Sequence, residues 1–171
     1  MAKPEHMTSL RGAQMVEKTH PVIRLRGQLD ALQAAVLLAK LRAQEKNREE
    51  AVAALGEIDA LIAQIFNAEY KEEPLPPFVL MGMDAAQLRA ASHNPEAFYG
   101  IPHVQPCAEM GRLCLELNAL RAQARAAELC AVEAFGATER PDILKALNRL
   151  SSAIYLLTLR EMPPGQWRRR C

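Results

Sequence analysis

Four long segments of this chain carry apolar residues at the three- and four-residue steps that place side chains on one face of a helix. These segments span residues 23–42, 48–70, 107–135 and 141–162. Helix-breaking residues separate or end them, namely the proline-rich stretches 74–77 and 163–165 and the glycine at position 136. This pattern predicts an all-α, up-and-down bundle of four or five helices.

The remaining segments are short or irregular. Asp84 is placed to cap a short helix over residues 85–92, after an apolar loop at 78–83. Residues 93–106 show no periodicity, and no segment has the length and alternation of an ordinary strand. We therefore expect a loose N-terminal segment at 1–14, a single helical-bundle domain at 15–162 and a C-terminal tail at 163–171.

The composition agrees with one helical domain and narrows the function classes. With 171 residues, half of them hydrophobic, the chain is long enough to bury a core. Aromatic residues make up 5% and glycines number 8, which favours helices packed through small side chains. A net charge of +1 excludes whole-molecule attraction to nucleic acid or membrane. No apolar run approaches the roughly 20 residues of a membrane span, and no signal peptide opens the chain, so a cytoplasmic protein is expected.

The four cysteines, at positions 107, 114, 130 and 171, form no Cys-x-x-Cys pair. Three of them lie in helical patterns, where buried free thiols are common, so reduced thiols are expected rather than a disulfide framework. An alternative is a zinc or ferrous iron site at His103, Cys107 and Cys114, whose steps of four and seven share a helix face. That site is the less favoured interpretation, because a closed structural site requires four ligands.

A polar stripe stands where a helix would normally present Leu or Ala to a core. Asn118, Arg121, Arg125 and Glu128 follow one another at steps of three, four and three, which places them on one helix face. Arginines at i and i+4 repel each other by roughly 0.3 kcal/mol unless an anion lies between them. The polar stripe therefore indicates a binding site for an anionic group.

The final helix places Asn148 and Arg149 beside its buried apolar residues. Arginine grips phosphate through several hydrogen bonds of its planar guanidinium, so the two arginines of the polar stripe, with Asn148 and Lys18, would suit a polyphosphate. Asp30 is available to form an ion pair with one of the arginines. Taken singly, each of these charges can instead solvate a helix face or form a structural ion pair, and this alternative stays open.

Three segments in order along the chain carry a resemblance. Residues 140–152 read Arg-Pro-Asp-Ile-Leu-Lys-Ala-Leu-Asn-Arg-Leu-Ser-Ser, and residues 117–128 read Leu-Asn-Ala-Leu-Arg-Ala-Gln-Ala-Arg-Ala-Ala-Glu. The third segment is Lys18-Thr-His-Pro21, with Gly27 and Asp30 nine and twelve residues after the lysine. Together these segments resemble the ATP:corrinoid (cobalamin) adenosyltransferases of the helical-bundle type, most of all the branch that serves ethanolamine utilization. The resemblance runs from about residue 15 to 162.

The resemblance implies nucleotide-binding roles for four residues. Arg125 and Lys18 would hold the triphosphate of ATP, and Asn148 and Glu128 would lie around the nucleotide. Together with Mg²⁺, the cationic side chains would stabilise the negative charge of the leaving triphosphate.

The resemblance also implies how the site is shaped. Arg121 would act in catalysis by pairing with Asp30, and Arg149 would brace the same corner. Phe78, in the apolar loop, would face the corrinoid and keep its lower axial ligand away from cobalt. Family members are trimers with the site between subunits, so a homotrimer is expected.

The implied reaction transfers the 5′-deoxyadenosyl group of ATP to the cobalt(I) of reduced cobalamin, giving adenosylcobalamin and triphosphate. The cobalt ion is itself the nucleophile, so no side-chain base is required, and the sequence shows no Ser/His/Asp or Cys/His catalytic set. The product would serve an adenosylcobalamin-dependent ethanolamine ammonia-lyase. A reductase and association with a bacterial microcompartment are further expectations of the resemblance.

Two departures from relatives and one rival function remain. Relatives of the propanediol branch carry a Gly-Asp-x-Gly segment where this chain has Arg11-Gly-Ala-Gln-Met-Val16. The ethanolamine branch often has an N-terminal His and a Cys-Cys-x-x-Cys metal motif, which this sequence lacks. The rival function is a non-catalytic bundle that binds corrinoid, ATP or a partner protein. The joint presence of the polar stripe, Asn148 and Asp30 favours the enzyme, because a scaffold does not require them.

Overall fold

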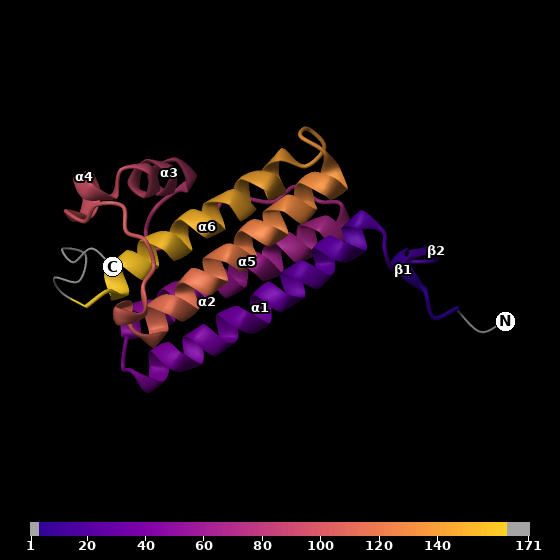
Figure 1. Ribbon diagram of the computed structural model, residues 1–171. Helices are drawn as coiled ribbons and strands as arrows, with labels where there is room; N and C mark the ends of the chain where they lie inside the picture. The colour runs from indigo at the N-terminus through magenta and orange to yellow at the C-terminus, as the bar shows by residue number, and fades with distance from the viewer. Residues whose placement is uncertain (1–3, 164–171) are drawn as a thin grey trace.

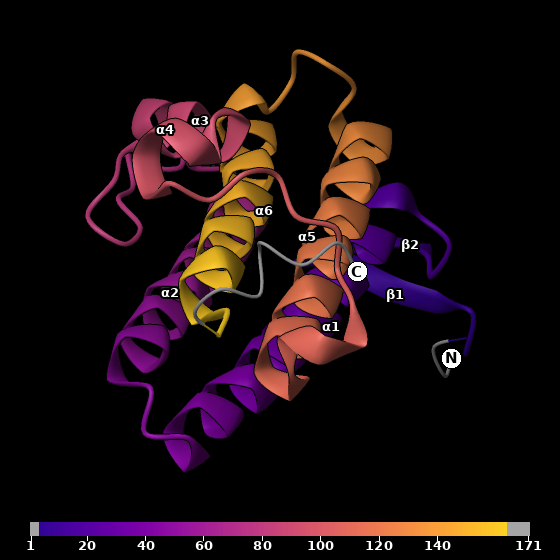
Figure 2. The same cartoon turned by 60° about the vertical axis from the view of Figure 1, so that its left-hand side comes forward.

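The computed structural model describes residues 4–163 and shows four long helices packed in a bundle (Figure 1). They are α1 (Pro21–Glu45), α2 (Glu49–Lys71), α5 (Arg112–Phe135) and α6 (Pro141–Glu161). α5 packs on both α6 and α1, α1 packs on α2, and α2 packs on α6, so the four helices close a ring around one core (Figure 2). The predicted all-α bundle is confirmed, and α1, α2 and α6 begin and end within a few residues of their predicted bounds.

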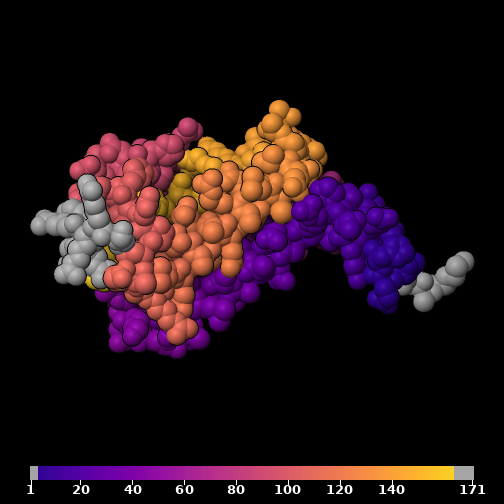
Figure 3. Space-filling model, in the orientation of Figure 1, coloured from indigo at the N-terminus to yellow at the C-terminus, as the bar shows by residue number. Residues whose placement is uncertain are grey.

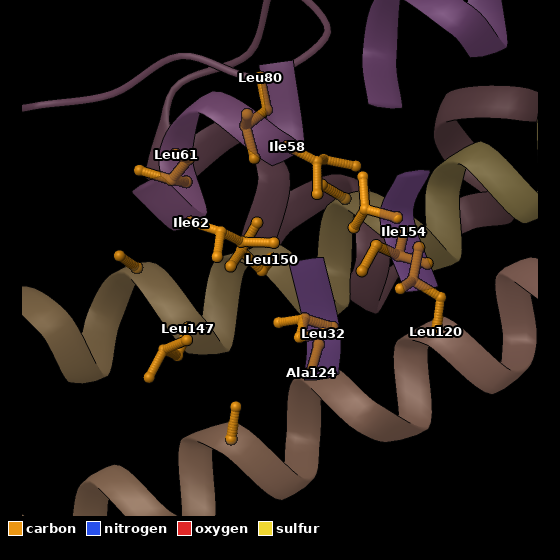
Figure 4. Close-up of a cluster of buried hydrophobic side chains, with 14 of the residues drawn as sticks. Leu32, Ile58, Leu61, Ile62, Leu80, Leu120, Ala124, Leu147, Leu150 and Ile154 are labelled. Carbon is orange, nitrogen blue, oxygen red and sulfur yellow. The ribbon is translucent and has the colours of Figure 1, made fainter. Parts of the chain in front are cut away.

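The core is built from the apolar faces of these helices (Figure 4). Leu32 of α1, Ile62 of α2 and Leu150 of α6 meet there and are almost completely buried. On α5 the buried positions include the alanines Ala124 and Ala127, and small side chains allow neighbouring helices to approach closely. This packing fixes the polar stripe of α5 relative to α6.

Local sequence accounts for where the helices start. Pro21 and Pro141 stand in the first turns of α1 and α6, where no backbone hydrogen bond is lost. The predicted cap at Asp84 is confirmed, because its side chain accepts from two backbone N–H groups in the first turn of α3 (Ala85–His93). The Gln87 side chain accepts from the Asp84 N–H in return, which completes a capping box.

Two short strands form a hairpin before α1, so the expectation of a loose N-terminal segment without strands is wrong. β1 (Met7–Arg11) pairs antiparallel with β2 (Gln14–Glu17). The turn between them contains Gly12, whose φ of +52° favours glycine. The strand sequences Met-Thr-Ser-Leu-Arg and Gln-Met-Val-Glu do not alternate strictly between apolar and polar residues, so the pattern by which strands are predicted is missing. The hairpin projects from one end of the bundle (Figures 1 and 3).

A buried ion cluster of Arg11, Arg26 and Glu69 ties the hairpin to the bundle. Glu69 of α2 is fully buried and accepts from Arg26 Nε at 2.6 Å and from Arg11 Nη2 at 2.8 Å. Arg26 Nη1 also donates to the backbone oxygen of Leu10 at 2.8 Å. A buried carboxylate is stable only when cations and hydrogen bonds compensate its lost hydration. The ion cluster therefore holds β1, α1 and α2 together.

The segment before α5 differs from the sequence prediction. Within 93–106, expected to be irregular, Asn94 caps the short helix α4 (Pro95–Tyr99). α5 begins at Arg112 rather than at 107, because Gly111 has a φ of +83° that ends the 3₁₀ helix η1 (Ala108–Met110) before α5 can start. Residues 101–107 have no regular structure. α3 packs on α6 at the end of the bundle away from the hairpin (Figure 1).

Within residues 4–163, α2 alone has the length and composition that a membrane-crossing helix needs. The expectation that no stretch approaches this length is therefore corrected for α2. Core helices of soluble proteins meet the same criterion, and the buried face of α2, which includes Ile58, Ile62 and Ile65, packs within the bundle.

Candidate active site

The polar stripe of α5 opens into a pocket of about 320 Å³ between α5 and α6. Asn118, Arg121 and Arg125 line this pocket from α5, and Tyr155 lines it from α6. The end of α3 and residues in the segment 103–110 line the remaining sides. Three of the four stripe residues thus share one cavity, because their three- and four-residue steps point them toward the same side of α5.

The two arginines of the pocket have no anionic partner within residues 4–163. Arg121 donates from Nε and Nη2 to Asn118 Oδ1, at 3.3 and 3.2 Å, and this neutral amide leaves its charge uncompensated. Arg125 is exposed, and neither arginine belongs to an ion pair among these residues. Two guanidinium groups one helical turn apart, facing a cavity, form a site that favours a multiply charged anion.

A hydrogen-bonded chain joins the next turn of α5 to α6. Asn148 Nδ2 donates to Glu128 Oε1 at 2.6 Å, and Arg149 Nη2 donates to Asn148 Oδ1. Arg149 is buried, and its Nε and Nη1 atoms have no partner within residues 4–163. Burial and the nearby Arg89 lower the pKa of Arg149, and Glu128 opposes this effect. Glu128, Asn148 and Arg149 are therefore held together by hydrogen bonds.

Glu128, Asn148 and Arg149 do not line the pocket itself, and three further predicted site residues lie away from it. Asp30 is exposed beside a hollow of about 270 Å³ between α1 and α2, so it forms no ion pair with Arg121 within one chain. Lys18 is exposed directly after β2. Phe78 lines a third cavity of about 540 Å³, with prolines of the same loop and Lys145 of α6.

His103 and Tyr155 also line the pocket, and sequence reasoning did not assign them to it. The hydroxyl of Tyr155 lies 3.1 Å from His103 Nδ1. Burial raises the pKa of Tyr155, while the Val104 N–H and the charge of Arg121 oppose the rise. For Tyr155 a signal was present, because it lies seven residues after Asn148 and thus on the same helix face. For His103, in an irregular segment, no periodicity could have indicated the position.

The cysteines only partly follow the prediction. Cys114 and Cys130 are free thiols, as expected. Cys107 is disulfide-bonded, so the expectation of reduced thiols is wrong for it, and Cys171 lies outside the described residues. In residues 4–163 no group of three or more His, Cys, Asp or Glu side chains is arranged to hold a metal ion. The alternative metal site at His103, Cys107 and Cys114 is therefore wrong.

Comparison with known proteins decides the family. Residues 2–161 match the family model of cobalamin adenosyltransferases. This chain belongs to the cobalamin adenosyltransferase family. The adenosyltransferase resemblance of the three sequence segments is thereby confirmed, and the polar stripe and pocket are features of a member of this family.

Named relatives of this family member agree with the assignment. The corrinoid adenosyltransferases EutT of Salmonella typhimurium and Escherichia coli K12 are each 32% identical to it over 161 residues. The match covers 92% of this chain and 59% of each relative, so the chain spans little more than half of their length. A variant of the PduO-type ATP:corrinoid adenosyltransferase from Lactobacillus reuteri, complexed with cobalamin and ATP, has the same fold. Its TM-score is 0.65 at 20% identity, with 93% of this chain and 92% of that chain covered.

Proposed function

We propose that this cobalamin adenosyltransferase family member transfers the 5′-deoxyadenosyl group of ATP to reduced cobalamin, with release of triphosphate. The observation that carries the proposal is the pair Arg121 and Arg125, which face the α5–α6 pocket without an anionic partner in residues 4–163. Cobalt(I) supplies the electron pair of the new Co–C bond. The bond between the 5′ carbon and oxygen breaks, and triphosphate leaves with both electrons of that bond.

The cationic residues would hold the leaving group. Arg125 and Lys18 would bind the triphosphate, and the chain of Glu128, Asn148 and Arg149 would lie around the nucleotide. Fixed positive charges stabilise a leaving anion because they need no reorganisation as charge develops. Mg²⁺ would enter together with ATP and would neutralise part of the charge of its phosphates.

The assembly that fits this site is a homotrimer. Asp30 lies on the α1–α2 side of the bundle, and the pocket lies on the α5–α6 side. A neighbouring copy would supply Asp30 to Arg121 across a contact between these two different faces. Exposed apolar side chains on α1, Leu37, Leu38 and Leu41, would be covered in such a contact.

The proposed function also includes a corrinoid contact and two partner proteins. Phe78 would contact the corrinoid although it lines a cavity separate from the arginines. A reductase would supply cobalt(I), and an ethanolamine ammonia-lyase would receive the product, in the cytoplasm or in a microcompartment. Both partner proteins are proposed because the sequence resembles the ethanolamine-utilization branch of the family.

An anaerobic assay tests the proposed function. Chemically reduced cobalamin, ATP and Mg²⁺ are mixed with the protein, loss of cobalt(I) absorbance is followed, and products are identified. We expect adenosylcobalamin and triphosphate, and a loss of about 100-fold or more in kcat/KM for Arg125→Ala, typical of removing a group that stabilises the transition state. Arg112→Ala is the matched control, because Arg112 is on the same helix but pairs with Glu116 at the surface.

Two outcomes would contradict the proposal. Binding of ATP and cobalamin without transfer would favour the rival non-catalytic bundle. Equal losses in Arg125→Ala and Arg112→Ala would show that the pocket is not the site of the charge stabilisation.

A further inference from the structure

His103 joins the wall of the pocket to α6 through a hydrogen-bond network with defined donors. Its Nε2 lies 3.2 Å from the backbone oxygen of His93, and its Nδ1 lies 3.1 Å from the hydroxyl of Tyr155. A carbonyl oxygen only accepts, so the network assigns the ring hydrogen to Nε2 and makes Nδ1 the acceptor from Tyr155. The two rings are stacked with centroids 6.0 Å apart at 17°. His103 is therefore held in one tautomer and one orientation.

This network supports a segment that has no regular secondary structure. Residues 101–106 belong to no helix or strand, and no backbone–backbone hydrogen bond links them to another described residue. The side chains of Ile101 and Val104 pack against the hydrophobic core. Tyr155 is anchored in α6, one of the core helices. The hydroxyl of Tyr155 is thus the hydrogen-bonded point at which α6 holds this part of the pocket wall.

The pocket has two chemically different sides. Arg121 and Arg125 make the α5 side cationic, whereas the segment before α5 contributes the uncharged Val104, Pro106 and Met110 beside His103. A triphosphate would bind the cationic side. The uncharged side suits the broad apolar face of a macrocycle better than a phosphate or the hydrogen-bonding edge of a base.

We propose that His103 is a positioning residue that, through Tyr155, fixes the 103–106 segment as the wall meeting the corrinoid. This inference rests on the proposed function and deepens it. His103 itself does not contact the reacting atoms. Its loss frees the segment, so the corrinoid must order this wall on binding, whereas the nucleotide side is held by α5 and stays unchanged.

The test compares two substitutions of nearly equal shape. Leu and Asn both branch at Cγ, but only the Asn side chain offers an oxygen near the position of Nδ1 that can accept from Tyr155. We expect His103→Leu and Tyr155→Phe each to raise KM for cob(I)alamin and the Kd for cob(II)alamin by roughly fivefold, the worth of one hydrogen bond. KM for ATP stays within about twofold, and His103→Asn recovers most of the loss. Tyr99→Phe, which removes a hydroxyl outside this pocket, serves as the control.

A double-mutant cycle completes the test. The double variant His103→Leu with Tyr155→Phe is expected to be no worse than either single variant, because both remove the same bond. Losses of cobalamin binding that add in the double variant would overturn the proposal. So would a single variant that raises only KM for ATP, or a loss in His103→Asn as large as in His103→Leu. An unchanged Kd for cob(II)alamin in His103→Leu, together with a large loss of cobalamin binding in Phe78→Ala, would also overturn it. Normal transfer with unaffected variants refutes only the role of His103, whereas a wild-type chain that binds no cobalamin refutes the proposed function as well.

Discussion

Asp142 secures the junction between the end of α2 and the start of α6, and its replacement by Asn gives a quantitative test of the structure. The Asp142 carboxylate accepts from Arg140 Nε at 3.1 Å, from Arg140 Nη2 at 2.9 Å and from the backbone N–H of Leu75 at 2.8 Å. Arg140 also donates to the backbone oxygens of Ala68 and Glu73. These bonds, led by those from Arg140, lower the pKa of Asp142 from 3.8 to about 2.

The shift sets the magnitude of the effect. Each pKa unit corresponds to about 1.4 kcal/mol, so the shift amounts to roughly 2.5 kcal/mol. The Asp142 side chain is 26% exposed, so screening by solvent reduces the contribution of this shift to stability. We expect Asp142→Asn to lower the free energy of unfolding by about 1–2 kcal/mol at pH 7.

The sign of the pH dependence follows from the depressed pKa. The folded protein keeps Asp142 ionised more strongly than the unfolded chain does, so the stabilisation is complete above about pH 4. It is lost as pH falls toward the folded-state pKa of about 2. The difference between wild type and Asp142→Asn should therefore shrink between pH 4 and pH 2.

Urea unfolding followed by circular dichroism at several pH values checks this expectation. Glu139→Gln is the control, because Glu139 is an exposed carboxylate in the loop just before α6. If the difference in unfolding free energy between wild type and Asp142→Asn stays constant from pH 7 to pH 2, the reasoning is refuted. An equal loss in Glu139→Gln would refute it too, because it would point to a general charge effect.

Two further predictions concern the N-terminal hairpin and the assembly. Glu69→Ala should lower the free energy of unfolding by about 3–5 kcal/mol, because two partly buried arginines lose their carboxylate. A protease should then cleave within residues 7–17 first. Unchanged stability in urea would contradict the role of the ion cluster. Co-expressed chains carrying Asp30→Ala and Arg121→Ala should recover adenosyl transfer that neither variant shows alone, since mixed trimers contain a contact with both residues intact. Absence of recovery in purified mixed trimers would refute a site shared between copies.

The bundle could be predicted because its helices are long and their periodicity is regular. The structured parts that escaped prediction are short, and tertiary contacts define them. β1 and β2 are held by Arg11 reaching Glu69, a contact across 58 residues that no local pattern reveals. The start of α5 was predicted too early because the apolar spacing continues through Gly111, whose backbone conformation interrupts the helix.

The part of the candidate site that lies on one helix could likewise be predicted from its regular spacing. Asn118, Arg121 and Arg125 could be grouped from one helix, because helical geometry fixes which side chains share a face. Glu128 and Asn148 come from different helices, and the structure joins them at 2.6 Å. His103 could not be placed, because its position depends on an irregular segment and on one bond to α6.

The proposed pairing of Asp30 with Arg121 would require two copies of the chain. Helices α1 and α2 form one side of the four-helix ring, and α5 and α6 form the opposite side. Asp30 beside the first seam therefore cannot serve the pocket at the second seam of its own bundle. A contact between two unlike faces repeats around an axis, and a rotation that closes after three copies gives a trimer with three equal sites. On this reasoning the uncompensated charge of Arg121 is a property of the single chain, and assembly would provide Asp30 from a neighbour while Arg125 stays free for triphosphate.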